Sequence, residues 1–98
     1  MEILAELHYF EIVNPDWKAK YNSGFRCNVK YDSNNYCCSV SHGLSRAIKQ
    51  GETHICEICF LTHEPHIGKI KPGMDIELFT GNVTFAEGKV TCVYDVGI

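Results

Sequence analysis

Residues 24–40 read GFRCNVKYDSNNYCCSV, and apolar and polar side chains alternate along both halves of this stretch. Alternation with a period of two is typical of a strand that buries one face. The apolar set that would share the buried face consists of Phe25, Cys27, Val29, Tyr31, Tyr36, Cys38 and Val40. The polar run at 32–35, Asp-Ser-Asn-Asn, is typical of a turn. The stretch therefore predicts a β-hairpin.

Working outward, further short apolar runs separated by turn residues predict more strands. They cover residues 2–13, 52–62, 75–79, 83–87 and 89–96, with turns expected at Gly51, Pro72-Gly73, Gly81-Asn82 and Gly88. Residues 52–62 are apolar on both sides of the strand, which predicts a central strand covered on both faces. Residues 44–49 are too short to distinguish a helical turn from a strand.

Six or seven short strands without a long helical period indicate an all-β fold. A chain of 98 residues is long enough for one hydrophobic core, so we expect a single domain over 1–98. Closing the sheet would remove its exposed edges. The sequence therefore favours a small closed antiparallel β-barrel of about six strands, with a β-sandwich as the related alternative.

The sequence contains six cysteines but no apolar run of about 18 residues and no apolar segment after a basic start. Disulfide scaffolds belong to secreted proteins, so we expect a cytoplasmic protein with reduced thiols that does not insert into membranes. At alternating apolar positions, as with Cys27, Cys38 and Cys92, a thiol packs as a small apolar group.

Cys56-x-x-Cys59 followed by His63 and His66 is the strongest candidate for a metal site, because thiolates and imidazoles bind zinc. Residues three apart in a strand point to opposite faces, which argues against convergence on one ion. His42 stands next to serines, but triad residues meet through the fold rather than along the chain. We expect no catalysis, no metal and no cofactor.

The charges are unevenly distributed, although the total is only −3. Residues 17–51 carry six basic side chains against one acidic side chain, while both flanks are acidic. Aromatic and arginine side chains are frequent anchors of binding surfaces. The predicted binding residues are Trp17, Lys18, Lys20, Tyr21, Phe25 and Arg26. The alternative is that Trp17 and Tyr21 close one end of the barrel.

Five short motifs follow one another in an order that is similar to the C-terminal, third β-barrel domain of elongation factor Tu. They are Ala5-Glu6-Leu7, Ser23-Gly24-Phe25-Arg26, Gly51-Glu52-Thr53, His63-Glu64-Pro65 and Gly73-Met74-Asp75-Ile76-Glu77-Leu78. The resemblance covers nearly the whole chain and implies a closed barrel of six antiparallel strands. Because the chain begins close to the first predicted strand and stops just after the last, we expect this barrel to be free-standing. In that family the domain helps to hold aminoacyl-tRNA and contacts the exchange factor, while a separate domain handles GTP.

Two departures from the family pattern bear on function. Arg26 matches the arginine of the Gly-aromatic-Arg motif, but Cys27-Asn28 follows it where the family has Pro-Gln. Residues 79–83 read FTGNV where the family has a turn with two arginines. Since arginines contact phosphates, their loss argues against retained tRNA binding.

These features lead to the expectation of a non-catalytic protein-interaction module. A small acidic domain of this kind could neutralise a basic toxin or nuclease as an immunity protein or antitoxin. The alternative is an RNA- or tRNA-binding accessory domain, in which basic side chains contact phosphates and Tyr21 or Phe25 stacks on bases. The basic side chains are Lys18, Lys20, Arg26, Lys30, Arg46 and Lys49.

Overall fold

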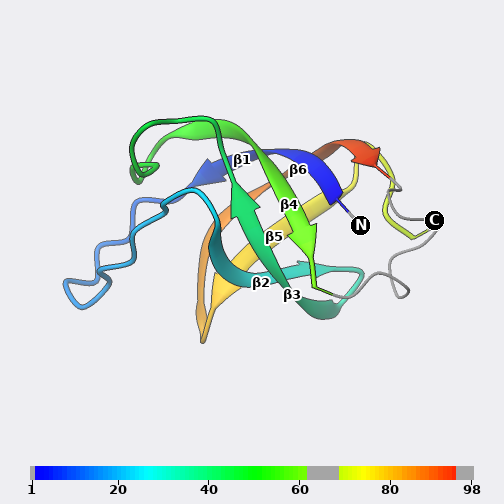
Figure 1. Ribbon diagram of the computed structural model, residues 1–98. Helices are drawn as coiled ribbons and strands as arrows, with labels where there is room; N and C mark the ends of the chain where they lie inside the picture. The colour runs from blue at the N-terminus through cyan, green and yellow to red at the C-terminus, as the bar shows by residue number, and fades with distance from the viewer. Residues whose placement is uncertain (1, 62–68, 95–98) are drawn as a thin grey trace.

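Six strands make up the computed structural model, which describes residues 2–61 and 69–94. They are β1 (Glu2–Tyr9), β2 (Phe25–Tyr31), β3 (Asn34–Ser41), β4 (Thr53–Phe60), β5 (Asp75–Thr80) and β6 (Val83–Tyr94). The strands pair antiparallel in the order β1-β4-β3-β2-β5-β6 and close through β1 and β6 (Figure 1). The predicted closed antiparallel barrel is therefore confirmed.

The predicted hairpin is formed by β2 and β3, which pair from Phe25–Val40 to Tyr31–Asn34. Its turn is shorter than expected, because only Asp32 and Ser33 lie outside the strands. Both have positive φ angles, 50° and 64°. This conformation suits two-residue hairpin turns, whose twist matches that of the strands.

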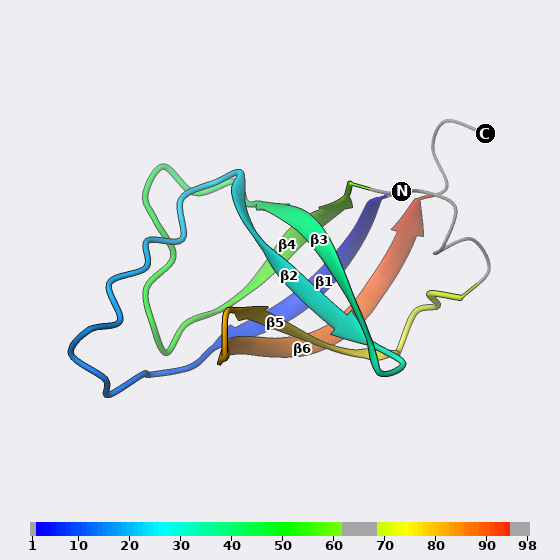
Figure 2. The same cartoon turned by 90° about the horizontal axis from the view of Figure 1, so that it is seen from below.

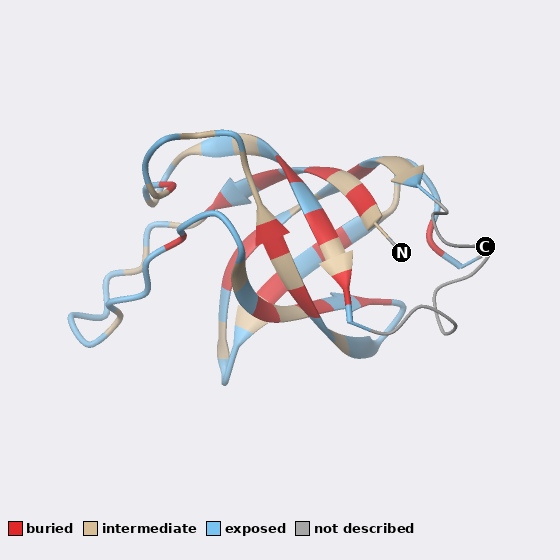
Figure 3. Ribbon diagram, in the orientation of Figure 1, coloured by how far each residue is buried: buried red, intermediate tan, exposed pale blue. Residues whose placement is uncertain are grey.

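Buried and exposed residues alternate along most strands, as expected when successive side chains face the barrel interior and its outer surface (Figure 3). Cys27, Cys38 and Cys56 point inward and pack as small apolar groups, whereas Cys92 is half-buried. The largest fully buried side chains are Tyr9, Phe85, Ile3, Leu7, Ile58, Ile76 and Leu78. The core therefore consists mainly of the inward positions of all six strands, to which the loops add Tyr21, Ile48 and Ile70.

The prediction that residues 52–62 are covered on both faces is wrong. In β4, Cys56 and Ile58 are buried, but Ile55 is 60% exposed and Leu61, just beyond the strand, is 55% exposed. The outer face of an antiparallel barrel has no covering layer, so apolar residues there stay in contact with solvent. Thr62 lies outside the described residues.

The two strands predicted at 83–87 and 89–96 are a single strand, β6, that runs through Gly88 to Tyr94. Gly88 is not at a turn. A Cβ atom there would lie 1.8 Å from the carbonyl oxygen of Glu6 on β1, so the close approach of the two backbones excludes any side chain. Residues 95–96 of the prediction lie outside the described residues.

Two long loops project from the same end of the barrel, residues 10–24 and 42–52 (Figures 1 and 2). The first begins earlier than predicted, because β1 ends at Tyr9 rather than continuing to residue 13. Residues 44–49 form neither a helical turn nor a strand, apart from one isolated bridge between Ile48 and Tyr21. Among the described residues, no helix is long and apolar enough to cross a bilayer.

Candidate functional site

The predicted aromatic residues lie at the loop end of the barrel, where they form what we call the aromatic plug. Its members are Tyr9, Trp17, Tyr21, Phe25 and Phe85. The rings of Tyr21 and Phe85 stack at 5.0 Å, and the indole nitrogen of Trp17 donates a hydrogen bond to the Tyr21 hydroxyl at 3.1 Å. Tyr21 is 2% exposed, and its burial raises the pKa of its phenol. These contacts close the end of the barrel.

The predicted basic residues are more exposed than the aromatic residues. Lys18 and Lys20 are exposed on the loop between β1 and β2, and Arg26 is exposed on the outer face of β2. The six predicted binding residues therefore differ in exposure: Tyr21 belongs to the core, Trp17 and Phe25 are half-buried, and the cations are exposed. Their role in binding stays a prediction.

Glu52 holds the loop 42–52 in place. Both of its carboxylate oxygens accept hydrogen bonds from the Arg46 guanidinium, at 2.8 and 2.9 Å, and Oε1 also accepts one from the Lys49 backbone N–H at 2.8 Å. The Arg46 hydrogen bonds and the Lys49 N–H lower the Glu52 pKa to about 2. His54 Nε2 lies 3.4 Å from the same oxygen without forming a hydrogen bond. The Arg46 guanidinium is thus bound to Glu52 of the same loop.

The two loops are also joined to each other through side chains. The Gln50 amide oxygen accepts the Ile12 backbone N–H at 2.8 Å. His42 Nε2 lies 2.9 Å from the Tyr21 carbonyl oxygen, and its Nδ1 accepts the Leu44 N–H at 3.3 Å. Both ring nitrogens of His42 therefore bond to the backbone, and this histidine acts as a structural connection.

The Cys56-x-x-Cys59 motif is arranged as its spacing predicts. Cys56 is buried inside the barrel, 3.5 Å from the Tyr9 hydroxyl, while Cys59 is on the outer side of β4. His63 and His66 lie outside the described residues. Within the described part of the chain, no group of three or more His, Cys, Asp or Glu side chains is placed to hold a metal ion.

A second candidate surface lies on the outer side of β1, β5 and β6, and the sequence did not single it out. Cross-strand pairing creates two rows on it. In the first row Glu6, Lys89 and Asp75 are neighbours, and Lys89 Nζ donates to Asp75 Oδ1 at 2.7 Å. In the second row His8, Glu87 and Glu77 are neighbours. We call these six residues the acidic face.

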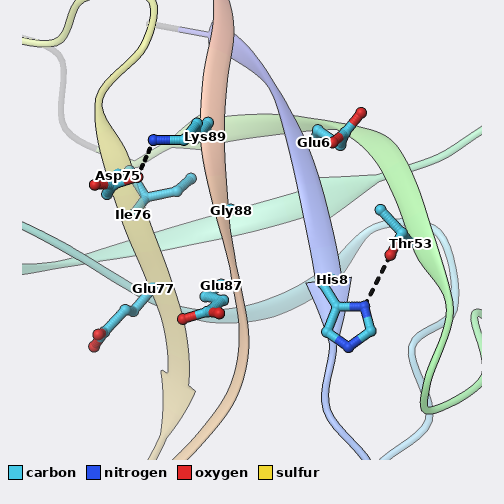
Figure 4. Close-up of a pocket in the computed structure, with 9 residues that line it drawn as sticks. All are labelled: Glu6, His8, Thr53, Asp75, Ile76, Glu77, Glu87, Gly88 and Lys89. Carbon is cyan, nitrogen blue, oxygen red and sulfur yellow. Dashed lines mark hydrogen bonds and ion pairs between the residues drawn. The ribbon is translucent and has the colours of Figure 1, made fainter.

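The acidic face is hollowed rather than flat. A shallow cavity of about 520 Å³ lies over it, and the residues that line it are Glu6, His8, Thr53, Asp75, Ile76, Glu77, Glu87, Gly88 and Lys89 (Figure 4). Gly88 forms part of its floor, where β1 and β6 approach closely. At one side His8 Nδ1 is 2.8 Å from the Thr53 hydroxyl. The hollow therefore presents four carboxylates and one ammonium group to solvent.

Glu77 and Glu87 are the unusual pair on this surface. They are direct partners across β5 and β6, and both are exposed. Like charges directly opposite one another destabilise a sheet. Lys30 on β2 is the other cross-strand neighbour of Glu77, so the acidic face ends at a basic residue on that side.

A scan of the sequence against models of protein families finds no match, and a search of curated proteins finds no match either.

Proposed function

We propose that this protein is a non-catalytic protein-interaction module, and that its acidic face binds a positively charged protein. The observation that carries the proposal is the juxtaposition of Glu77 and Glu87 over a hollowed surface. Such a pair costs stability in the free protein. A positively charged side chain of the partner that binds between the Glu77 and Glu87 carboxylates would attract both and remove their mutual repulsion.

The surroundings of the pair agree with this proposal. Asp75 and Glu6 lie on the same surface, and Lys89 neutralises only one of the four carboxylates through its ion pair with Asp75. The side chains of Asp75 and Lys89 are 82% and 66% exposed, so this ion pair is free to rearrange around a partner. Complementary charge accelerates association and excludes partners of the wrong sign.

Neutralisation of a basic toxin or nuclease is the specific form of this function that we favour. A nuclease must attract phosphates, so its active cleft is cationic and complementary to the acidic face. The six-stranded barrel agrees with the resemblance to the third domain of elongation factor Tu, which we keep as a proposal. The chain would then be an elongation-factor-Tu-like barrel used as an immunity protein or antitoxin.

RNA binding is the alternative, and the exposed Lys18 and Lys20 on the projecting loop favour it. Two features weaken it. Tyr21, proposed to stack on bases, is packed in the aromatic plug, and Arg46 is held by Glu52. Base stacking and phosphate contacts need side chains that are free to reach the nucleic acid.

Affinity capture from a lysate of the native host, with the tagged protein as bait and with or without RNase, distinguishes protein binding from RNA binding. The proposal predicts that basic proteins are recovered in both samples and that salt releases them. Recovery of nucleic acid alone, together with salt-dependent RNA affinity in filter binding, would replace it with the RNA-binding alternative.

A further inference from the structure

Cys27 on β2 and Cys38 on β3 are directly opposed in the hairpin, and both side chains point into the barrel. Their sulfur atoms are 3.7 Å apart. Directly opposed residues of antiparallel strands have Cα atoms about 4.5–5.5 Å apart, which lies within the range that disulfides span. An S–S bond is about 2.05 Å long, so the two sulfurs need to approach by less than about 2 Å.

The other cysteines lack such a partner. All six are described by the structure, and the strand pairing opposes no other two of them. Cys37 is next to Cys38 in sequence but points outward, where its thiol donates to the Asn28 side-chain oxygen. Cys56 contacts the Tyr9 hydroxyl instead. Cys27 and Cys38 are therefore the two cysteines whose cross-strand pairing and sulfur–sulfur distance favour a disulfide.

We propose that Cys27 and Cys38 form an intramolecular disulfide by exchange with a small-molecule disulfide such as oxidised glutathione. In the first step a thiolate of the pair attacks one glutathione sulfur, forms a mixed disulfide and releases one glutathione thiolate. In the second step the other thiolate attacks the protein sulfur of the mixed disulfide and releases the second glutathione. The protein thiols lose two protons and two electrons, and the glutathione disulfide is reduced to two thiols.

Burial controls how fast this exchange proceeds. The hydrogen bond with Cys38 and the burial of the thiol raise the pKa of Cys27, so little thiolate is present in the closed barrel. The hairpin can open at its seam with β5, where pairing extends only from Asn28 to Lys30. Cys27 and Cys38 are also among the residues that line a shallow hollow. Exchange therefore follows local opening of the hairpin and is slow.

The disulfide would join β2 to β3 across the hairpin turn. A cross-link stabilises chiefly by restricting the unfolded chain, and a loop of this length is expected to raise the Tm by about 10–20 °C. Because the acidic face lies on β1, β5 and β6, the cross-link leaves it unchanged. This inference is thus independent of the proposed function.

The experiment incubates the wild-type protein with oxidised glutathione, blocks remaining thiols by alkylation and maps the cross-link by peptide mass spectrometry. We expect a species that carries two fewer alkyl groups than the fully reduced protein, a Cys27–Cys38 linked peptide and a raised Tm that reverts with dithiothreitol. Cys37→Ser, which removes an exposed neighbouring thiol, keeps the product, while Cys27→Ser and Cys38→Ser abolish it.

The wild-type map decides the question even if the core variants do not fold. A linked peptide that contains Cys37, Cys59 or Cys92 in place of Cys27 or Cys38 overturns the proposal. So does a protein whose Cys27 and Cys38 remain fully alkylatable after prolonged exposure to oxidised glutathione in mild urea.

Discussion

Glu77 on β5 lies directly opposite Glu87 on β6, and a register shift in the sheet produces this pairing. Near the turn Thr80 pairs with Val83 and Phe79 with Thr84, a register that would place Glu77 opposite Ala86. The bulge between Leu78 and Phe79 moves the register by one residue and turns Glu87 to the outer surface. A single irregularity thus creates the central feature of the acidic face.

Replacing Glu87 with Lys should stabilise the protein, because it converts the repulsion by Glu77 into an attraction. We expect a gain of about 0.5 kcal/mol, or a Tm higher by about 2–4 °C. Calorimetry measures it. Glu57→Lys makes the same charge change on β4, away from the acidic face, and serves as the control. A lower Tm for Glu87→Lys than for this control contradicts the account of the pair.

Gly88→Ala should destabilise the barrel severely, because the new Cβ would collide with the Glu6 carbonyl on β1. We expect a loss of about 3 kcal/mol or more in the free energy of unfolding, measured in urea. Gly43→Ala is the matched control, since a Cβ there meets nothing within 4 Å. Equal stability of the two variants would show that β1 and β6 do not approach as described.

Tyr21→Phe should weaken the aromatic plug by removing the hydroxyl that accepts the Trp17 indole N–H. A lost hydrogen bond of this kind costs about 1 kcal/mol. Trp17 is the one tryptophan of the chain, so its fluorescence reports on the plug directly. Tyr36→Phe removes a hydroxyl that interacts with Tyr31 outside the plug, so it serves as the comparison for Trp17 emission. If Tyr21→Phe leaves both stability and Trp17 emission unchanged, the indole does not depend on this hydrogen bond.

The lowered pKa of Glu52 predicts how the loop 42–52 responds to acid. A carboxyl group whose pKa is lower in the folded state stabilises fully above its unfolded pKa, about 4.3, and loses that contribution as the pH falls. With a folded pKa of about 2, the loss occurs between about pH 4 and pH 2. Hydrogen exchange should show the Lys49 amide losing protection in this window, since it donates to Glu52.

Glu52→Gln removes this dependence, because the amide does not titrate. Glu57→Gln, at an exposed position on β4, should leave it intact. Protection of the Lys49 amide that persists to pH 2 in the wild-type protein would refute the assigned role of Glu52.

Much of the fold could be predicted from the sequence, whereas little of the candidate site could. The alternation from Phe25 to Val40 predicted β2 and β3 correctly, because inward and outward positions differ clearly in polarity. The prediction that both faces of β4 are covered was wrong, because Ile55 is apolar but lies exposed on the outer face. Gly88 was read as a turn, although it marks a close approach between strands.

The acidic face could not be found from the sequence because it depends on strand register. Asp75 and Glu77 alternate with buried residues, so their outward direction was predictable. The position of Glu87 opposite Glu77 was not predictable, because it follows from a β-bulge that no residue type in the sequence indicates. The aromatic and basic residues at 17–26 were conspicuous in sequence, but in the fold the rings are buried or half-buried while the cations are exposed.

The binding role of the acidic face is tested most directly by comparing two double variants that lose the same charge. Glu77→Gln/Glu87→Gln alters the acidic face, and Glu11→Gln/Glu57→Gln removes two exposed carboxylates elsewhere. Each is used as bait in the native host, and the affinity for the captured protein is then measured by calorimetric titration. We predict a basic partner whose affinity falls at least about tenfold for the first variant and stays near wild type for the second. Equal affinity of both variants for that partner would contradict the proposal.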